Sequence, residues 1–448
     1  MNSIAQWIGV EADWMLKSPE PWSHLVSVSP KELATHALVL GATGSGKTVL
    51  LLHLIAQDLE RGHSVCLLDL RGDLVNAVIE LCARDIDPSR LRIIDLREKV
   101  RPFGFNPLHG SGEPYFRSLS VLEAVANEAE SWGVQLAESL RNALMLLAET
   151  GAALTDLEKL FYGRSLRQQL LDRCTTDTVV AFWNRYDELS NERQATFAMP
   201  VLNKVSLLLA TPTLRRILGH PEPIDLGDHL NTPGSVTLVS LAVDELHGSA
   251  RMMGNIILSS ICREVFARVE TAESQRNPIR LYVDEFENFG MKDFESILAE
   301  GRRFKLSAVL AHQTLAQLSP RMRSMILGNV GVKFVFRCGR EDSLNMSRDI
   351  FGDPKGYDLT DLPVGYCVLW KRQDGFVEVE VNEPLVRDVG HRSDAAKRFL
   401  SEVYDQAGTA FDVPHFREEP ECQPLKGNVE RSKPTPRPKA ELEDWLCE

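Results

Sequence analysis

The residues best suited to chemistry form one short segment near the start of the chain. Residues 41–48 read Gly-Ala-Thr-Gly-Ser-Gly-Lys-Thr, which has the spacing G-x-x-x-x-G-K-[ST] of a phosphate-binding loop, or Walker A motif. The apolar run 37–40 precedes this segment and the run 49–52 follows it, so we predict a loop between a strand and a helix. We therefore expect the chain to bind ATP together with Mg²⁺.

Each residue type in this loop suits a task at a phosphate group. Its glycines allow tight turns that aim backbone N–H groups at the phosphates, and the following helix adds its positive N-terminal end. We expect Lys47 to reach the β- and γ-phosphates and the Thr48 hydroxyl to bind Mg²⁺. Thr43 and Ser45 are expected to shape the loop. The predicted nucleotide-binding residues are Gly41, Ala42, Thr43, Gly44, Ser45, Gly46, Lys47 and Thr48.

Two carboxylates follow another apolar run. Residues 279–283 are predicted to form a buried strand that leads directly into Asp284 and Glu285. Parallel sheets place their ligand sites at the carboxyl ends of the strands, so this pair is interpreted as a Walker B motif. Asp284 is expected to hold Mg²⁺, commonly through its water, and Glu285 to polarise the water that attacks the γ-phosphate.

A further strand, predicted for residues 307–311, delivers His312 and Gln313 to the same edge of the sheet. The neutral amide of Gln313 can hydrogen-bond the terminal phosphate or the attacking water, so we expect it to act as a γ-phosphate sensor. His312 is interpreted as a structural neighbour.

The basic stretch 301–305 lies between these two strands. In a ring it could face the nucleotide of a neighbouring subunit, which makes Arg302 the leading candidate for an arginine finger. Arg303 is the second choice, and Arg337 or Arg340 a more distant one. The alternative interpretation is a solvated basic end of a helix, favoured by the helix dipole.

The predicted elements place the chain in the α/β class with a mostly parallel sheet. Strands expected at 64–70, 91–96 and 235–241 alternate with helices, which is typical of that class. From about 115 to 219 the strand signal is absent and apolar residues recur at helical spacing. The segments 365–370 and 376–381 look like a hairpin at the edge of the sheet. The predicted division is an N-terminal segment 1–30, an ATPase core 31–114 and 220–390, an inserted all-α domain 115–219, and a C-terminal helix with a flexible tail 391–448.

Composition and charge bear on the partners and the cellular location of the protein. The 448 residues carry a net charge of −13, which argues against wholesale coating of nucleic acid but allows a basic pore inside an acidic exterior. The eight cysteines include no C-x-x-C pair and are expected to be buried cytosolic thiols. A basic leader and a run of about 18 apolar residues are both missing, so we expect a soluble, cytoplasmic protein. Residues 442–446 could dock a partner at the end of the tail, the alternative being a solvated terminus.

These motifs together resemble the HerA/FtsK superfamily of P-loop ATPases, with the closest likeness to type IV coupling proteins of the TraG/TraD kind. The likeness covers roughly residues 30–385, and the Asn-Lys-x-Asp of small GTPases and the Leu-Ser-Gly-Gly-Gln of transporter ATPases are absent. The segments that carry it are the two Walker motifs, Asp69 with the following Leu70-Arg71-Gly72-Asp73-Leu74, residues 101–108, the helical insert, Gly301-Arg302, Gln313 and residues 328–339.

The resemblance implies a RecA-like motor that assembles as a hexameric ring, hydrolyses ATP at its subunit interfaces and drives DNA through a central channel, with the insert at one mouth. Coupling proteins usually begin with transmembrane helices, which this chain lacks. We therefore expect a soluble DNA translocase acting in conjugative transfer, DNA processing or defence. Two alternatives stay open: a secretion-type ATPase acting on protein cargo, and a nucleotide-gated scaffold that recruits an effector. Candidates for basic surfaces are Lys204, Arg215, Arg216, Arg321 and Arg323.

Overall fold

The computed structural model describes residues 6–11, 25–127, 131–209, 211–381, 383–386 and 390–407. All of them belong to the unit Met1–Phe411. The tail residues 442–446, for which docking of a partner and a solvated terminus are the two alternatives, lie outside the described residues.

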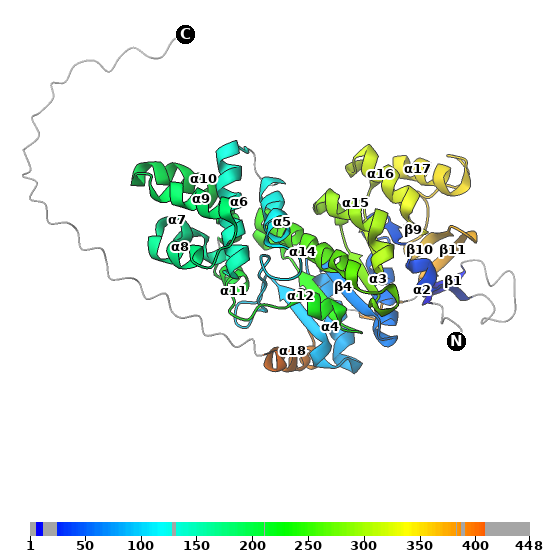
Figure 1. Cartoon of the computed structure of the whole chain (residues 1–448). Helices are drawn as coiled ribbons and strands as arrows, with labels where there is room; N and C mark the ends of the chain where they lie inside the picture. Colours follow the sequence, from blue (N-terminus) through cyan, green and yellow to red (C-terminus); the bar gives the residue numbers. More distant parts are fainter. Residues whose placement is uncertain are drawn as a thin grey trace, which may run out of the picture. The chain divides into compact units, whose positions relative to one another are not determined.

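Within the described residues, eleven strands form one sheet, in the order β2-β1-β11-β10-β9-β3-β8-β7-β4-β6-β5 (Figure 1). The seven strands from β9 to β5 are parallel to one another, as predicted for most of the sheet. They read as almost continuous apolar runs because helices cover both faces. Their bounds are β3 Ala37–Leu40, β4 Ser64–Asp69, β5 Leu91–Asp95, β6 Val236–Ser240, β7 Ile279–Val283, β8 Leu306–His312 and β9 Val332–Phe336.

The other end of the sheet is antiparallel. Strands β10 (Tyr366–Lys371) and β11 (Gly375–Val381) form the predicted hairpin. The expectation that this hairpin is the sheet edge is wrong, because β1 (Gln6–Glu11) pairs with β11 and β2 (Leu25–Val28) pairs with β1. Both strands come from the segment predicted to precede the core. They are short, and the register of their pairing shifts between Trp7 and Gly9, so their sequences carry little period-two signal.

Alternate residues of the parallel strands enter two separate cores, one on each face of the sheet. In β3, for example, Ala37 and Val39 belong to one core, and Leu38 and Leu40 to the other. The first core contains residues of α3 (Lys47–Glu60), α4 (Asp73–Asp85) and α18 (Asp394–Gln406). The second contains residues of α14 (Gly248–Phe266), α15 (Met291–Glu300), α16 (Pro320–Asn329) and α17 (Arg340–Phe351). Shorter helices are α2 (Pro30–Leu33) and α13 (Val243–Leu246).

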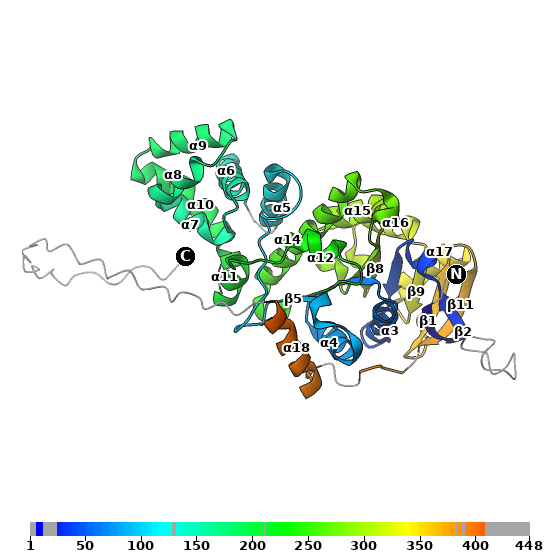
Figure 2. The ribbon, with the colours of Figure 1, turned by 60° about the horizontal axis from the view of Figure 1, so that its bottom comes forward.

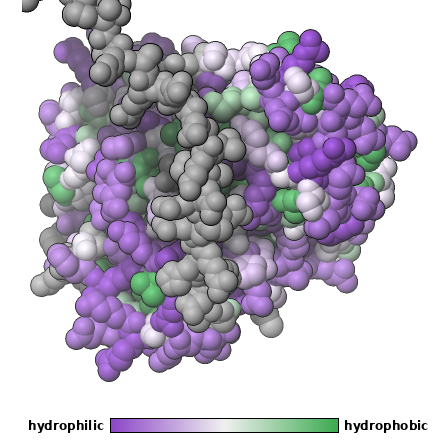
Figure 3. Space-filling model, turned by 90° about the vertical axis from the view of Figure 1, so that its left-hand side faces the viewer, coloured by the Kyte–Doolittle hydropathy of each residue, from purple (hydrophilic) through white to green (hydrophobic). Residues whose placement is uncertain are grey.

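Between β5 and β6 the chain forms a group of helices. Figure 2 shows α6 to α10 gathered together, with α5 between them and α14. The boundaries 115 and 219 stay a prediction. The face of the molecule in Figure 3 is mostly hydrophilic in its described residues, with hydrophobic residues scattered singly. The helix bounds are α5 Pro114–Asn127, α6 Val134–Thr150, α7 Leu157–Tyr162, α8 Arg164–Leu171, α9 Asp177–Asp187, α10 Asn191–Leu209, α11 Pro212–Leu218 and α12 Leu226–Asn231.

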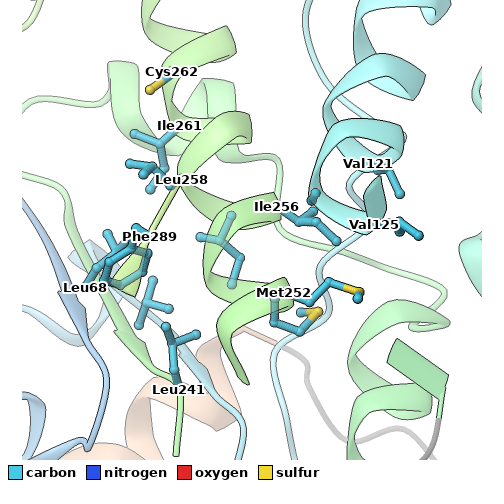
Figure 4. Packing of buried hydrophobic residues seen from close by; sticks show 14 of the residues in the cluster. Leu68, Val121, Val125, Leu241, Met252, Ile256, Leu258, Ile261, Cys262 and Phe289 are labelled. Carbon is cyan, nitrogen blue, oxygen red and sulfur yellow. The ribbon is translucent and has the colours of Figure 1, made fainter. Parts of the chain in front are cut away.

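Helix α14 joins these helices to the sheet. Figure 4 shows Met252 and Ile256 of α14 near Val121 and Val125 of α5, with other apolar side chains of α14 on the side of the sheet. The packing is tight at Gly254, where a Cβ atom would lie 2.6 Å from Cδ1 of Leu241. The sheet and the helices between β5 and β6 therefore share one continuous core.

No single helix in the described ranges is both long enough and apolar enough to cross a membrane. The pair α10 and α11 reaches that length and hydropathy only when the two helices are joined across the 98° bend between them.

Candidate nucleotide-binding site

The predicted phosphate-binding loop connects β3 to α3, as its sequence context indicates. Backbone hydrogen bonds fix it between two neighbouring strands: the Gly41 N–H donates to His312 O over 3.2 Å, and the Ala42 N–H donates to Arg337 O over 2.8 Å. Gly46 has a φ of 119°, a conformation that L side chains rarely adopt. The loop thus has a fixed place at the carboxyl edge of the sheet.

Lys47 begins α3 and is nearly buried, with 8% of its surface exposed. Its Nζ donates to the carbonyl oxygens of Gly41 and Ala42 over 2.6 and 3.0 Å. Burial lowers the pKa of this ammonium group, while the carboxylates of Asp284, Glu285 and Glu287 oppose that shift. The positive charge therefore lies inside the curve of the loop. Thr48 follows on the exposed side of the helix start.

Asp284 follows β7, and its N–H donates to Leu68 O of β4 over 3.1 Å. Burial raises the pKa of its carboxyl group to about 6, and the nearby carboxylates of Asp69 and Glu285 add to this shift. Asp69 ends β4 and is itself buried, with its carboxylate accepting from the N–H groups of Arg71 and Val75 over 2.9 and 3.0 Å. This concentration of acidic groups beside Lys47 favours a cation at the same edge.

Glu285 is held by a chain of side chains that reaches the phosphate-binding loop. Nε2 of Gln313 donates to Oε1 of Glu285 over 2.8 Å, and Oγ1 of Thr43 donates to Oε1 of Gln313 over 3.3 Å. Nη2 of Arg71 lies 3.4 Å from the same Glu285 oxygen. The backbone of Glu285 is left-handed, with φ 51°, which is uncommon for a residue that has a side chain.

The predicted residues of the Walker motifs and Gln313 therefore lie at one edge of the sheet. His312 is buried beside them, with its Nδ1 2.7 Å from Oε2 of Glu287 and its ring against Phe286. Among the alternative arginines, Arg337 is adjacent to the loop through its backbone, and Arg340 begins α17.

Arg302 lies elsewhere. It precedes β8, whereas Gln313 follows that strand, so seven residues of extended chain, about 20 Å, separate the two ends. Arg302 is exposed and lines a hollow of about 360 Å³ at the amino edge of the sheet, together with Lys31, His63 and Lys305. The structure does not bring Arg302 to the other site residues of its own chain.

Two site residues were not predicted for the site, Arg71 and Asp69. Both follow from the position of β4 next to β7, which pairs Leu68 with Val283 and brings the ends of the two strands together. The signal that could have found them is an apolar run that ends in an aspartate and is followed by a glycine three residues later.

The model of the family described as "Helicase HerA, central domain" matches residues 23–265, more than half of the chain. The chain belongs to the HerA family. A second family model, described as "TraM recognition site of TraD and TraG", matches residues 278–355. A search of curated proteins finds no match. The two family models confirm the predicted relation of this HerA-family chain to coupling proteins.

Solved structures confirm the RecA-like α/β fold of this HerA-family chain. The bacterial conjugative coupling protein TrwBdeltaN70 matches with a TM-score of 0.58 and 16% identity, over 83% of this chain and 89% of that one. The plasmid coupling protein TrwB in complex with ADP and Mg²⁺ gives 0.56 and 14%, over 83% and 90%. VirB4 of Thermoanaerobacter pseudethanolicus gives 0.57 and 13%, over 86% and 97%.

Proposed function

We propose that this HerA-family protein hydrolyses ATP with the help of Mg²⁺ and uses the energy to move DNA. The observation that carries the proposal is the chain Thr43–Gln313–Glu285, which joins the phosphate-binding loop to a carboxylate beside Lys47. A carboxylate and an amide so placed could position a water molecule for attack on the terminal phosphate.

The eight residues from Gly41 to Thr48 would hold the phosphates, and Thr48 and Asp284 would hold Mg²⁺. Two observations fit these ligands: the buried Oγ of Ser45 has no hydrogen-bond partner among the described residues, and acidic groups surround Asp284. Across the described ranges, no three His, Cys, Asp or Glu side chains gather into a metal site of their own, so the phosphates would complete the ion's ligands. Bound Mg²⁺ would neutralise charge on the β- and γ-phosphates.

Glu285 would accept a proton from the attacking water while the oxygen of that water bonds to the γ-phosphorus. The bond from that phosphorus to the oxygen bridging to the β-phosphate breaks, and ADP leaves with that oxygen. Gln313 would hold Glu285 in line and contact the terminal phosphate. A hollow of about 390 Å³ beside Gly46, lined also by Val49, Gly365 and Glu380, offers room for the ribose and base.

Arg302 would act on the nucleotide of a neighbouring subunit. Its place at the amino edge of the sheet, opposite the phosphate-binding loop, supports a head-to-tail contact between copies. Head-to-tail contacts of this kind form a ring when the rotation between subunits closes, and we propose a hexameric ring. The finger would stabilise charge on the transferred phosphoryl group.

DNA is the proposed cargo because two of the similar structures are described as coupling proteins, one of them as conjugative. We place the protein in the cytoplasm, in conjugative transfer, DNA processing or defence. The match of residues 278–355 to a recognition site for TraM favours a protein partner as well, so an ATPase directed at protein, or a scaffold that recruits an effector, is the second candidate. Residues 442–446 would be a further docking point.

The test is steady-state ATP turnover over a range of protein concentrations that spans assembly. Linear double-stranded DNA, single-stranded DNA and RNA are added in turn, with Glu285→Gln as the blank. Turnover that rises severalfold with DNA and falls on dilution supports the translocase. Turnover that depends on assembly but ignores every nucleic acid supports the second candidate. Absence of turnover under all conditions contradicts both enzyme proposals.

A further inference from the structure

We propose that Arg71 is a positioning residue that aims the carboxylate of Glu285, an inference that rests on the proposed ATP hydrolysis. Its Nη2 lies 3.4 Å from Oε1 of Glu285, and 64% of its side chain is exposed against 19% for Glu285. The guanidinium therefore reaches from the surface onto the carboxylate that is proposed to activate water.

The backbone at Arg71 is anchored, although its side chain is exposed. Its N–H donates to the buried carboxylate of Asp69, and its carbonyl accepts from the guanidinium of Arg97, which also pairs with Asp244 and Glu245. The next residue, Gly72, has a φ of 97°, and a Cβ atom there would lie 2.6 Å from Oγ of Ser240. These contacts determine where the guanidinium of Arg71 can reach.

Glu285 receives its two donors from opposite sides. Strand β7, which Glu285 follows, lies between β4 and β8 in the sheet; Arg71 follows β4 and Gln313 follows β8. Both donors meet the same oxygen, Oε1. A left-handed residue such as Glu285 keeps its conformation when its surroundings over-determine it, and these two donors contribute to that restraint.

Removing the arginine side chain would leave the carboxylate held by Gln313 alone. An exposed ion pair adds little to folding stability, so the loss should appear in catalysis rather than in stability. Because Arg71 acts through Glu285 and not through the nucleotide, kcat should fall while KM for ATP is kept.

The test compares Arg71→Ala, Arg71→Lys and a matched control, Arg164→Ala, which removes another exposed arginine (75%) whose Nε lies 3.9 Å from a carboxylate, that of Asp187. Arg71→Ala should lower kcat roughly tenfold with KM within about twofold, and Arg71→Lys should restore turnover to within about threefold of wild type. Arg164→Ala should match wild type. All variants should melt at the wild-type temperature.

A double variant separates positioning from other roles. In the Glu285→Gln background, with Lys47→Ala as the baseline for this measurement, Arg71→Ala should change the residual turnover by less than about twofold, because the group it aims is gone. A full tenfold effect in that background, or wild-type kcat in Arg71→Ala, overturns the inference. If the wild-type protein itself shows no ATP turnover, the proposed function is contradicted. Failure of the inference about Arg71 and failure of the proposed function therefore give different results.

Discussion

Nε2 of Gln313 donates a hydrogen bond to Oε1 of Glu285 over 2.8 Å, while Oε1 of the same amide accepts one from Thr43. One side chain thus contacts both the phosphate-binding loop and the carboxylate proposed to activate water. A change at the phosphates can pass directly to Glu285 through this amide.

Gln313→Ala should therefore separate binding from turnover. We expect kcat to fall roughly 10- to 100-fold and ATP affinity to change by less than about threefold, because the loop and Lys47 are intact. Single-turnover kinetics and binding of a fluorescent ATP analogue measure the two quantities. Gln317→Ala, an exposed glutamine shortly after it, is the control and should resemble wild type. If ATP affinity and kcat fell by the same factor in Gln313→Ala, Gln313 would have a role in ATP binding and none in the hydrolysis step.

Lys47→Ala should abolish nucleotide binding. The variant removes the ammonium group that lies inside the loop and leaves the acidic groups around Asp284 to repel the phosphates. Isothermal titration with ATP and Mg²⁺ should give no measurable heat. The control is Lys397→Ala on α18, an exposed lysine 3.5 Å from Asp394. Tight ATP binding by Lys47→Ala would refute the assignment of the loop.

Arg302→Ala should bind ATP normally. Its rate of ATP hydrolysis should fall roughly 10³-fold if the arginine acts on the nucleotide of a neighbouring subunit. A subunit-mixing experiment tests the neighbour directly. Lys47→Ala subunits cannot bind ATP but carry an intact Arg302, so mixing them with Arg302→Ala subunits should restore part of the activity. Failure to complement, or wild-type rates in Arg302→Ala, would move the role to Arg303 or Arg337.

His36→Asn should reduce the acid sensitivity of the fold. Burial, aided by the charge of Arg302, lowers the pKa of His36 to about 4 from 6.5. The unfolded chain then binds more protons between these values, so stability falls as pH drops from 6.5 to 4, by up to about 3 kcal/mol. Asparagine tolerates the φ of 63°, and its Oδ1 can replace Nδ1 as acceptor for the Ala308 N–H.

Denaturant titrations at pH 7 and pH 4.5 measure this effect. His36→Asn should lose less stability than wild type between the two values. Identical pH dependence in wild type and His36→Asn would contradict the prediction.

The sequence predicts the phosphate-binding loop and Asp284–Glu285 because each follows directly from a local apolar run. Gln313 is also predictable, since two successive strands of a parallel sheet usually lie near each other. Arg71 is harder: β4 lies between β7 and β6, whereas the strand after it in the chain, β5, is at the sheet edge. The site of action of Arg302 depends on a second copy, which one chain cannot reveal.

The chain leaves the sheet after β5 and returns as β6, and these strands are direct neighbours, with Leu91 opposite Val236. All five residues of β5 pair with β6, from Leu91 with Val236 to Asp95 with Ser240. Each doubling of a flexible connection costs only about 0.6 kcal/mol in closure entropy, so the pairing of β5 with β6 puts little limit on the length of chain between them. The helices in that chain are limited instead by the core that they share with α14. The strand pairing therefore tolerates helices of different length between β5 and β6, whereas the shared core restricts which residues can cover α14.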